Sequence, residues 1–352
     1  MNRALSFFLL LFMLAAPSRA ATTQPISFLD AAKELTTHIQ KTYYHPDTGL
    51  YDHSTTKQEP EAMWGNGVLF SALVGAARHD PATYKPILSK FFDAMNQYWD
   101  SKAKIPGYEP WPTRGNGNDK YYDDNQWMVI TFLDAYELTK DKKYLNRADE
   151  ALKFALSGWD EQMGGGIWWH EQHKSDSKNT CSNAPAAVAC LRMAGYRRRE
   201  ENIAMAKKIV TWTNEHFQDA DALFFDNKHV TTGKMNRAKL TYNTALMLRA
   251  NLGLYRLTGE ARYLAEAKRI STACDWFVSN ETGAYRDNVK FGHLQVEADL
   301  EFAKTTGDER ALARARRNGE VAYENWRKNP SPDLIEQASV ARMLWLLAGQ
   351  TR

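Results

Sequence analysis

The chain has 352 residues, of which 43% are hydrophobic and 25% charged, and its 45 lysines and arginines face 42 aspartates and glutamates. This near balance argues against a polyanionic partner such as a nucleic acid, which requires a basic surface. Three cysteines are too few for a disulfide framework, although one pair could form, and the length is sufficient for a large hydrophobic core.

The first 20 residues have the pattern of a secretory signal peptide. Arg3 precedes an apolar run over residues 5–16, and Ser18-Arg19-Ala20 forms a cleavage site of the small-x-small type. The apolar run is short for a membrane span, so an uncleaved anchor is the weaker alternative. We therefore expect an exported protein, periplasmic or extracellular, with no membrane attachment after cleavage.

A short motif recurs along the rest of the chain. Each copy ends one run of periodic apolar residues, makes a turn and opens another run, with its aromatic residue at Tyr84, Tyr144 or Tyr263. Tyr84 and Tyr144 lie 60 positions apart, and Tyr263 follows after a further 119, close to two such steps; Ile203 stands at the missing middle position. A fixed period of this length predicts a repeated two-helix unit.

Within each unit, apolar residues recur at i, i+3, i+4 and i+7, which is typical of α-helices. One set of helices keeps a charged face and is predicted at residues 27–43, 81–99, 142–157, 200–217, 260–278 and 308–327. The other set is apolar nearly all round, as buried helices are, and is predicted at residues 62–78, 124–139, 182–195, 241–257, 292–304 and 333–348. The pattern predicts an all-α fold, an (α/α)6 barrel of six inner and six outer helices, formed by residues 21–352 as a single domain. An open solenoid of helix pairs is the alternative.

The loops that enter the inner helices are long and rich in aromatic residues. Residues 166–169 and 222–225 could pair as hairpin loops but not as a sheet. In a closed barrel these loops ring one end of the axis and form a concave site. Aromatic rings beside carboxylates and amides suit sugars, and Trp111, Trp168 and Trp169 are the expected platforms. The alternative is that such rings close the barrel end as core.

Two adjacent carboxylates, Asp123 and Asp124, stand at the start of the second inner helix. One aspartate would suffice to cap the helix. A second one, beneath Tyr121 and Tyr122 and before Trp127, places two anions in a partly apolar pocket. Like charges at short range push the two pKa values apart, so one carboxylate ionises while the other keeps a proton. Glycoside hydrolysis requires this combination, but spacing alone leaves catalysis and capping equally open.

The residues around this pair resemble glycoside hydrolase family 76, the α-1,6-mannanases. The matching segments, in order, are Tyr121-Tyr122-Asp123-Asp124 with Trp127, Leu133-Asp134-Ala135-Tyr136-Glu137-Leu138-Thr139, Ser157-Gly158-Trp159-Asp160, Gly164-Gly165-Gly166-Ile167-Trp168-Trp169, Lys178-Asn179 with Ser182-Asn183-Ala184, and Thr241-Tyr242-Asn243. The similarity runs over residues 64–258 and fades afterwards. It implies an (α/α)6 barrel and a retaining mechanism on α-1,6-mannan, with Asp123 as nucleophile and Asp124 as general acid/base.

The resemblance and the loop aromatics together give the candidate substrate-binding residues Trp64, Tyr122, Trp127, Trp168, Trp169, Asn183, Asp226, Tyr242 and Asn243. The expected partner is an oligo- or polysaccharide, α-mannan, bound by a monomer without a cofactor or metal. Three positions depart from the family pattern. Asn125 stands where an acidic or small residue is common, Thr180-Cys181 replaces a more apolar pair, and residues 289–292 only loosely match a Lys-Gly motif.

Other functions fit the sequence less well. His170 and His173 have the wrong spacing for two metal ligands on one helical face, and the nine histidines are expected on the surface or in loops. A sugar epimerase would need paired histidines, which no motif supplies, and a terpenoid cyclase would need a third carboxylate where Gln126 stands. A non-catalytic glycan-binding protein, or a hydrolase acting on another glycan, remains the alternative function.

Overall fold

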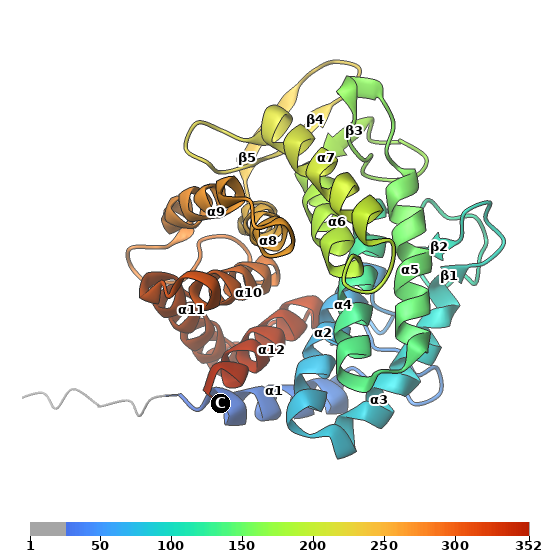
Figure 1. Cartoon of the computed structure of the whole chain (residues 1–352). Coiled ribbons are helices and arrows are strands. Elements are labelled where there is room, and N and C mark those ends of the chain that lie inside the picture. The colour runs from blue at the N-terminus through green and yellow to red at the C-terminus, as the bar shows by residue number, and fades with distance from the viewer. Residues whose placement is uncertain (1–25, 352) are drawn as a thin grey trace, which may run out of the picture.

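The computed structural model describes residues 26–351, so the predicted signal peptide lies outside the described part of the chain. Over residues 26–351 the chain forms twelve α-helices, joined by loops with short strands and 3-10 turns (Figure 1). Within that range, no helix combines the length and the apolar character that a bilayer span requires.

The polar-faced helices form the outer layer, as predicted. They are α1 (Phe28–Thr42), α3 (Pro81–Ala94), α5 (Lys142–Ser157), α7 (Arg199–Phe217), α9 (Ala261–Ala273) and α11 (Glu309–Lys328). Two of them end before their predicted limits because a 3-10 turn follows, η1 (Met95–Tyr98) after α3 and η3 (Cys274–Phe277) after α9. The apolar stripe of each outer helix packs on the inner layer.

The second set forms the inner layer, buried on nearly all sides. It consists of α2 (Met63–His79), α4 (Tyr122–Thr139), α6 (Thr180–Met193), α8 (Thr241–Thr258), α10 (Val289–Thr306) and α12 (Leu334–Ala348). In α6, for example, every residue except Arg192 is buried. All twelve predicted helices are confirmed.

The inner helices close into a ring. Each packs against the next inner helix in the sequence, and α12 packs against α2, so the first and last inner helices lie side by side (Figure 1). At this seam the backbones approach closely: a Cβ atom at Gly75 would lie 2.6 Å from Trp345 Cβ. The (α/α)6 barrel is confirmed, and the open solenoid is wrong.

The recurring sequence motif makes the tight turns at one end of the barrel. Inner helices α4 and α8 end at residues with left-handed backbone, Lys140 (φ 60°) and Gly259 (φ 71°), which release the chain from the helix. Aspartates after two of the inner helices start outer helices: Asp141, after α4, accepts the N–H of Lys143 at 3.0 Å, and Asp308, after α10, accepts that of Ala311 at 2.8 Å. These short turns leave the long loops to the opposite end.

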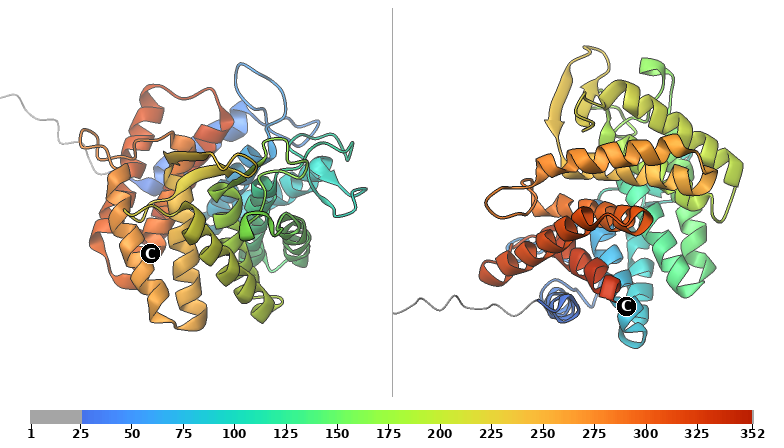
Figure 2. Two further views of the ribbon diagram at one scale, coloured as in Figure 1. Left: turned by 90° about the horizontal axis from the view of Figure 1, so that it is seen from above. Right: turned by 60° about the vertical axis from the view of Figure 1, so that its left-hand side comes forward.

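A small sheet that was not predicted from the sequence covers part of the barrel end that carries the long loops. Strands β3 (Ser177–Asn179), β4 (Phe225–His229) and β5 (Met235–Lys239) pair antiparallel in the order β3-β4-β5, and the hairpin β4–β5 extends outward from the helical body (Figure 2). A second pair, β1 (Trp99–Asp100) and β2 (Gly107–Tyr108), lies in the loop before α4. The expected hairpin pairing forms as isolated bridges, Trp159 with Ile167 and Gln218 with Phe224, whereas the expectation that no sheet forms is wrong at Phe225, which begins β4.

Candidate active site

The long loops and the first turns of the inner helices enclose a cavity of about 1050 Å³. Seven of the predicted site residues line it: both aspartates of the pair, three tryptophans, one further aspartate and one tyrosine, namely Asp123, Asp124, Trp64, Trp127, Trp169, Asp226 and Tyr242. They come from inner helices α2, α4 and α8, from strand β4 and from the loop before β3. The structure thus brings together residues that are up to 178 positions apart.

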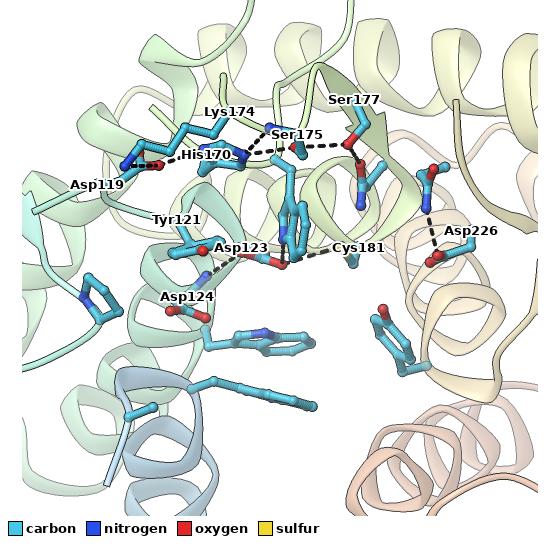
Figure 3. Close-up of a pocket in the computed structure, with 18 of the residues that line it drawn as sticks. Asp119, Tyr121, Asp123, Asp124, His170, Lys174, Ser175, Ser177, Cys181 and Asp226 are labelled. Atoms are coloured by element: carbon cyan, nitrogen blue, oxygen red, sulfur yellow. Dashed lines mark hydrogen bonds and ion pairs between the residues drawn. The ribbon is translucent and has the colours of Figure 1, made fainter. Parts of the chain in front are cut away.

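Asp123 is surrounded by hydrogen-bond donors (Figure 3). Its Oδ1 accepts the backbone N–H of Asp124 at 3.0 Å, and its Oδ2 accepts the indole N–H of Trp169 at 3.1 Å and the thiol of Cys181 at 3.2 Å. Burial raises the pKa of Asp123 to about 6, and these three donors oppose the rise. Within residues 26–351, no lysine or arginine forms an ion pair with it.

Asp124 has a different environment although it is the next residue. Among the described residues, no donor reaches its carboxyl group. Burial first, and then the charge of Asp123, raise the pKa of Asp124 well above its usual range. Asp123 therefore ionises at a lower pH than Asp124, which still holds its proton as Asp123 loses its own.

Helix capping does not account for the pair. The N-cap residue of α4 is Tyr121, which makes no side-chain capping bond, and the one N–H of a following helix residue that Asp123 accepts is that of its immediate neighbour, Asp124. The carboxyl group of Asp124 satisfies no N–H of the helix. An aspartate kept for capping would bond the N–H two or three residues further on, so the pair has another role.

The wall opposite α4 carries the third predicted aspartate. Asp226 lies across the cavity from the pair (Figure 3). Its carboxylate accepts from three amides, Asn227 at 2.8 Å, Asn236 at 3.0 Å and Asn243 at 3.3 Å. Burial raises its pKa from the ordinary value. These amides fix the orientation of Asp226, so it can accept a hydrogen bond from a ligand hydroxyl.

Aromatic rings form one side of the cavity. Phe291 stacks on Trp64 with ring centroids 5.7 Å apart and on Tyr242 at 4.6 Å. The three rings come from α10, α2 and α8, and each is partly exposed to the cavity. Phe291 was not predicted, because its segment matches the family motif only loosely. Trp111 also lines the cavity, at the rim, with 42% of its surface exposed.

Four predicted substrate-binding residues lie behind the cavity wall. Tyr122 is buried against Phe154, and Trp168 is 3% exposed, stacked on His173. The side chains of Asn183 and Asn243 are fully buried.

These buried residues support the wall instead of contacting a ligand. The amide of Asn183 accepts the backbone N–H of Ile167 at 2.8 Å and donates to the backbone carbonyl of Ile167 at 3.1 Å. The indole of Trp168 donates to Asp160 at 2.8 Å, and Asn243 donates to Asp226. Direct contact with a bound sugar, as predicted for the four, is not available to them in this structure.

A polar network that was not predicted from the sequence lies beside Trp169. His170 is buried, with Nδ1 2.7 Å from Asp119 Oδ2 and Nε2 2.7 Å from Ser175 Oγ (Figure 3). The network continues from Ser175 to Ser177 at 3.1 Å. The sequence offered one indication of this network, because His170 directly follows Trp169, which was predicted to contact the sugar. His170 lies in a loop, as expected of the histidines, whereas His293 departs from the expected surface or loop position because it is buried in α10.

Asp119, His170 and Ser175 have the order of a hydrolytic triad, but the contacts argue against one. The backbone N–H of Ser175 donates to His170 Nε2 at 2.8 Å and so occupies the lone pair that a general base would use. We interpret this network as the anchor of the loop that carries Trp169. No cluster of three or more metal-ligating side chains occurs within residues 26–351.

Comparisons with known proteins point to one family. The sequence profile of glycosyl hydrolase family 76 matches residues 27–313. A family 76 α-mannanase from Bacteroides thetaiotaomicron is 26% identical and superposes with a TM-score of 0.87, covering 92% of this chain and 96% of its own. Among curated protein sequences, none matches this chain.

Two further solved structures come from Salegentibacter sp. HEL1_6. Its α-1,6-mannanase is 24% identical, with a TM-score of 0.78 over 91% of this chain and 99% of its own. An inactive variant of that enzyme, with two consecutive aspartates replaced, was solved in complex with α-1,6-mannotetrose; it is 22% identical, with a TM-score of 0.78 over 92% and 99%. Both show the same fold as this chain.

Proposed function

The chain belongs to glycosyl hydrolase family 76 and is a glycoside hydrolase, and from this premise we propose that it cleaves α-1,6-linked mannan with retention, using Asp123 and Asp124. The observation that carries the proposal is the contrast between these neighbours. Asp123 accepts three hydrogen bonds and Asp124 accepts none, in one cavity lined by aromatic rings. The two steps of a retaining hydrolysis require this division of charge.

In the first step, Asp124 gives its proton to the glycosidic oxygen while Asp123 attacks the anomeric carbon. The glycosidic bond breaks, the leaving sugar departs as an alcohol, and an ester forms between Asp123 and the remaining glycan. In the second step, the ionised Asp124 takes a proton from water, and the resulting hydroxide displaces Asp123. Two inversions at the anomeric carbon give net retention, and both carboxyl groups return to their initial states.

The assignment of the pair has support from the sequence and from a relative. Asp123-Asp124 is the only pair of consecutive aspartates in the 352 residues. In the Salegentibacter α-1,6-mannanase, the inactive variant is one in which two consecutive aspartates have been replaced. That variant also holds an α-1,6-linked tetrasaccharide, which supports the same substrate class for this chain.

The cavity provides groups for both parts of a sugar. The rings of Trp64, Trp127 and Tyr242 can pack against its apolar face, and Asp226 can accept from its hydroxyls on the opposite wall. A volume of about 1050 Å³ is at the upper limit of typical ligand pockets, in keeping with an oligosaccharide.

The test is product analysis on linear α-1,6-mannan, comparing the wild type with Asp123→Asn and Asp124→Asn. We expect release of mannose or short oligosaccharides by the wild type, with the first product formed in the α configuration by NMR, and loss of both by each variant. Asp47→Asn, at an exposed position, is the matched control and should retain activity.

Other outcomes would point elsewhere. A product that first appears in the β configuration would contradict retention. Binding of mannan without cleavage by the wild type would favour the non-catalytic glycan-binding function, whereas no binding would move the search to other α-linked glycans. Activity in both aspartate variants would remove the pair from the mechanism.

We also propose that residues 1–20 are cleaved as a signal peptide and that residues 21–352 act as an exported, monomeric single domain. The proposal is supported by the order of features in residues 3–20: a basic residue, then an apolar run, then a cleavage site with small residues. N-terminal sequencing of protein recovered outside the cytoplasm should begin at Ala21, and light scattering should give the mass of one chain. A larger mass, or an intact Met1, would contradict this.

A further inference from the structure

One hydrogen bond to Asp123 comes from an unusual donor. Cys181 lies in the first turn of α6, where its Sγ is 3.2 Å from Asp123 Oδ2 (Figure 3). It is the only one of the three cysteines that lines the cavity, and it is 6% exposed. Cys190, nine residues further along the same helix, is fully buried and has no contact with the site.

The chemistry of the two groups fixes the direction of this bond. An ionised carboxylate can only accept, so the thiol must donate. Burial and the negative charge of Asp123 raise the pKa of the Cys181 thiol well above its ordinary value. The thiol therefore stays protonated and remains a donor throughout the range in which Asp123 ionises.

The bond also restrains the carboxylate. Trp169, from the loop before β3, and Cys181, from α6, both donate to Oδ2, while the backbone of Asp124 holds Oδ1. Three separate segments thus fix both oxygens of Asp123. A carboxylate that must attack one carbon atom gains from this, because a misplaced nucleophile loses rate steeply.

We propose that Cys181 is a positioning residue for the reaction: its thiol holds Asp123 in place and favours the ionised form of that carboxylate. The inference rests on the proposed function, because it gives Asp123 the role of nucleophile. The resemblance to family 76 does not supply it, since Thr180-Cys181 replaces a more apolar pair at this point of the family pattern.

The other groups that face Asp123 make the donors decisive. Asp124 and Tyr121 belong to the start of α4, Tyr242 to α8, and Asp226 to β4, where its charge acts on the same thiol. None of them is a cation: the two tyrosines are neutral and Asp124 keeps its proton where Asp123 ionises, and Asp226 is itself acidic. Since no cation pairs with Asp123 among the described residues, hydrogen bonds alone offset burial.

The test compares the pH dependence of kcat/KM in Cys181→Ala, Cys181→Ser and the wild type, with Cys190→Ala as the matched control. Loss of a donor to the ionised form raises the pKa of Asp123. We expect Cys181→Ala to move the acidic limb to higher pH by roughly half to one unit, which lowers kcat/KM about three- to tenfold below that limb. Cys181→Ser should restore most of this, and Cys190→Ala should change nothing.

A uniform loss across the pH range in Cys181→Ala, without movement of the acidic limb, would overturn the proposal and leave the thiol a packing role. So would an equal loss in the serine variant. A second measurement does not depend on catalysis: the carboxyl carbon of Asp123, labelled with ¹³C and assigned with Asp123→Asn, is titrated by NMR. Its pKa should rise in Cys181→Ala even if mannan is not the substrate, and an unchanged pKa would overturn the inference while leaving the proposed function intact.

Discussion

Lys178 Nζ lies 2.5 Å from Asp160 Oδ1, and the lysine side chain is completely buried whereas the aspartate is one-third exposed. The ammonium group also donates to the backbone carbonyls of Gln162 and Gly165, both at 2.7 Å. This single cation therefore ties the loop of residues 160–166, which contains Gly164-Gly165-Gly166, to β3. Ser177 and Asn179 of β3 line the cavity.

Replacing this lysine by methionine should destabilise the protein. Lys178→Met removes the cation that pairs with Asp160 and the donor that two buried carbonyls share, which costs about 2–3 kcal/mol of unfolding free energy. Denaturant titration measures the change. Lys208→Met, which removes an exposed lysine paired with the exposed Glu161, is the control and should cost under about 1 kcal/mol. Equal losses in both variants would contradict the anchoring role.

The wild-type pH profile should be bell-shaped with an acidic limb near pH 6. The pKa of Asp123 is about 6, so kcat/KM rises as this carboxylate ionises. The pKa of Asp124 lies well above its usual range, so activity falls at higher pH as its proton is lost. Initial rates on α-1,6-mannan between pH 4 and 9 would test both limbs. An acidic limb at the pKa of an ordinary aspartate would contradict the burial argument.

Asp124→Asn should be more stable than the wild type, increasingly so as pH rises. A carboxyl group whose pKa is raised in the folded state contributes most at low pH, and that contribution is lost as pH increases through the folded-state pKa. The amide has no charge to bury. We expect its Tm to exceed that of the wild type by about 2–4 °C at pH 8, corresponding to about 1 kcal/mol, and by less at pH 5. A pH-independent difference would speak against an ionising group.

Lys140→Gly should stabilise the turn between α4 and α5. Lys140 has φ of 60°, a left-handed conformation that costs a residue with a Cβ atom roughly 1 kcal/mol and a glycine little. Its side chain makes only a distant contact, 5.9 Å above the Tyr136 ring. We expect a gain of about 0.5–1 kcal/mol by thermal unfolding. The same change at Lys153, in the interior of α5, should destabilise the helix by about 1 kcal/mol.

Trp111→Ala should weaken the binding of longer oligosaccharides. Trp111 is 42% exposed at the cavity rim, where a sugar ring beyond the reacting bond can stack on it. We expect KM for mannan to rise about three- to tenfold with kcat unchanged, because the contact is equal in the ground and transition states. Trp276→Ala, at a 50% exposed tryptophan outside the cavity, should have no effect. A fall in kcat alone would contradict a platform role.

The helices were predictable because a helix that is buried on one face has apolar residues at helical spacing in its sequence. The turns were predictable too, because residues next to them in the sequence, such as Asp141 and Asp308, start the following helices. The sheet was not, because β3 has three residues, Ser177, Lys178 and Asn179, and β5 is polar and largely exposed. Short strands of this composition carry no alternation that distinguishes them from loops.

Within the site, residue types were predictable but their orientation was not. Trp168 and Trp169 are neighbours in an extended segment, so their side chains point to opposite sides, and only Trp169 reaches the cavity. Cys181 and Asn183 likewise lie on different faces of α6. Nothing local decides which face is turned to the ligand, since this depends on how distant segments pack.

The seam between α2 and α12 also governs how the barrel can be assembled. Synthesis delivers α2 early and α12 last, so every nascent chain is an open arc that lacks the helix closing it. Until α12 arrives, the apolar flank of α2 around Gly75 is uncovered and available to chaperones or to other nascent chains. Closure then joins partners about 270 residues apart in a single late event, and the cavity becomes a continuous surface only after that event.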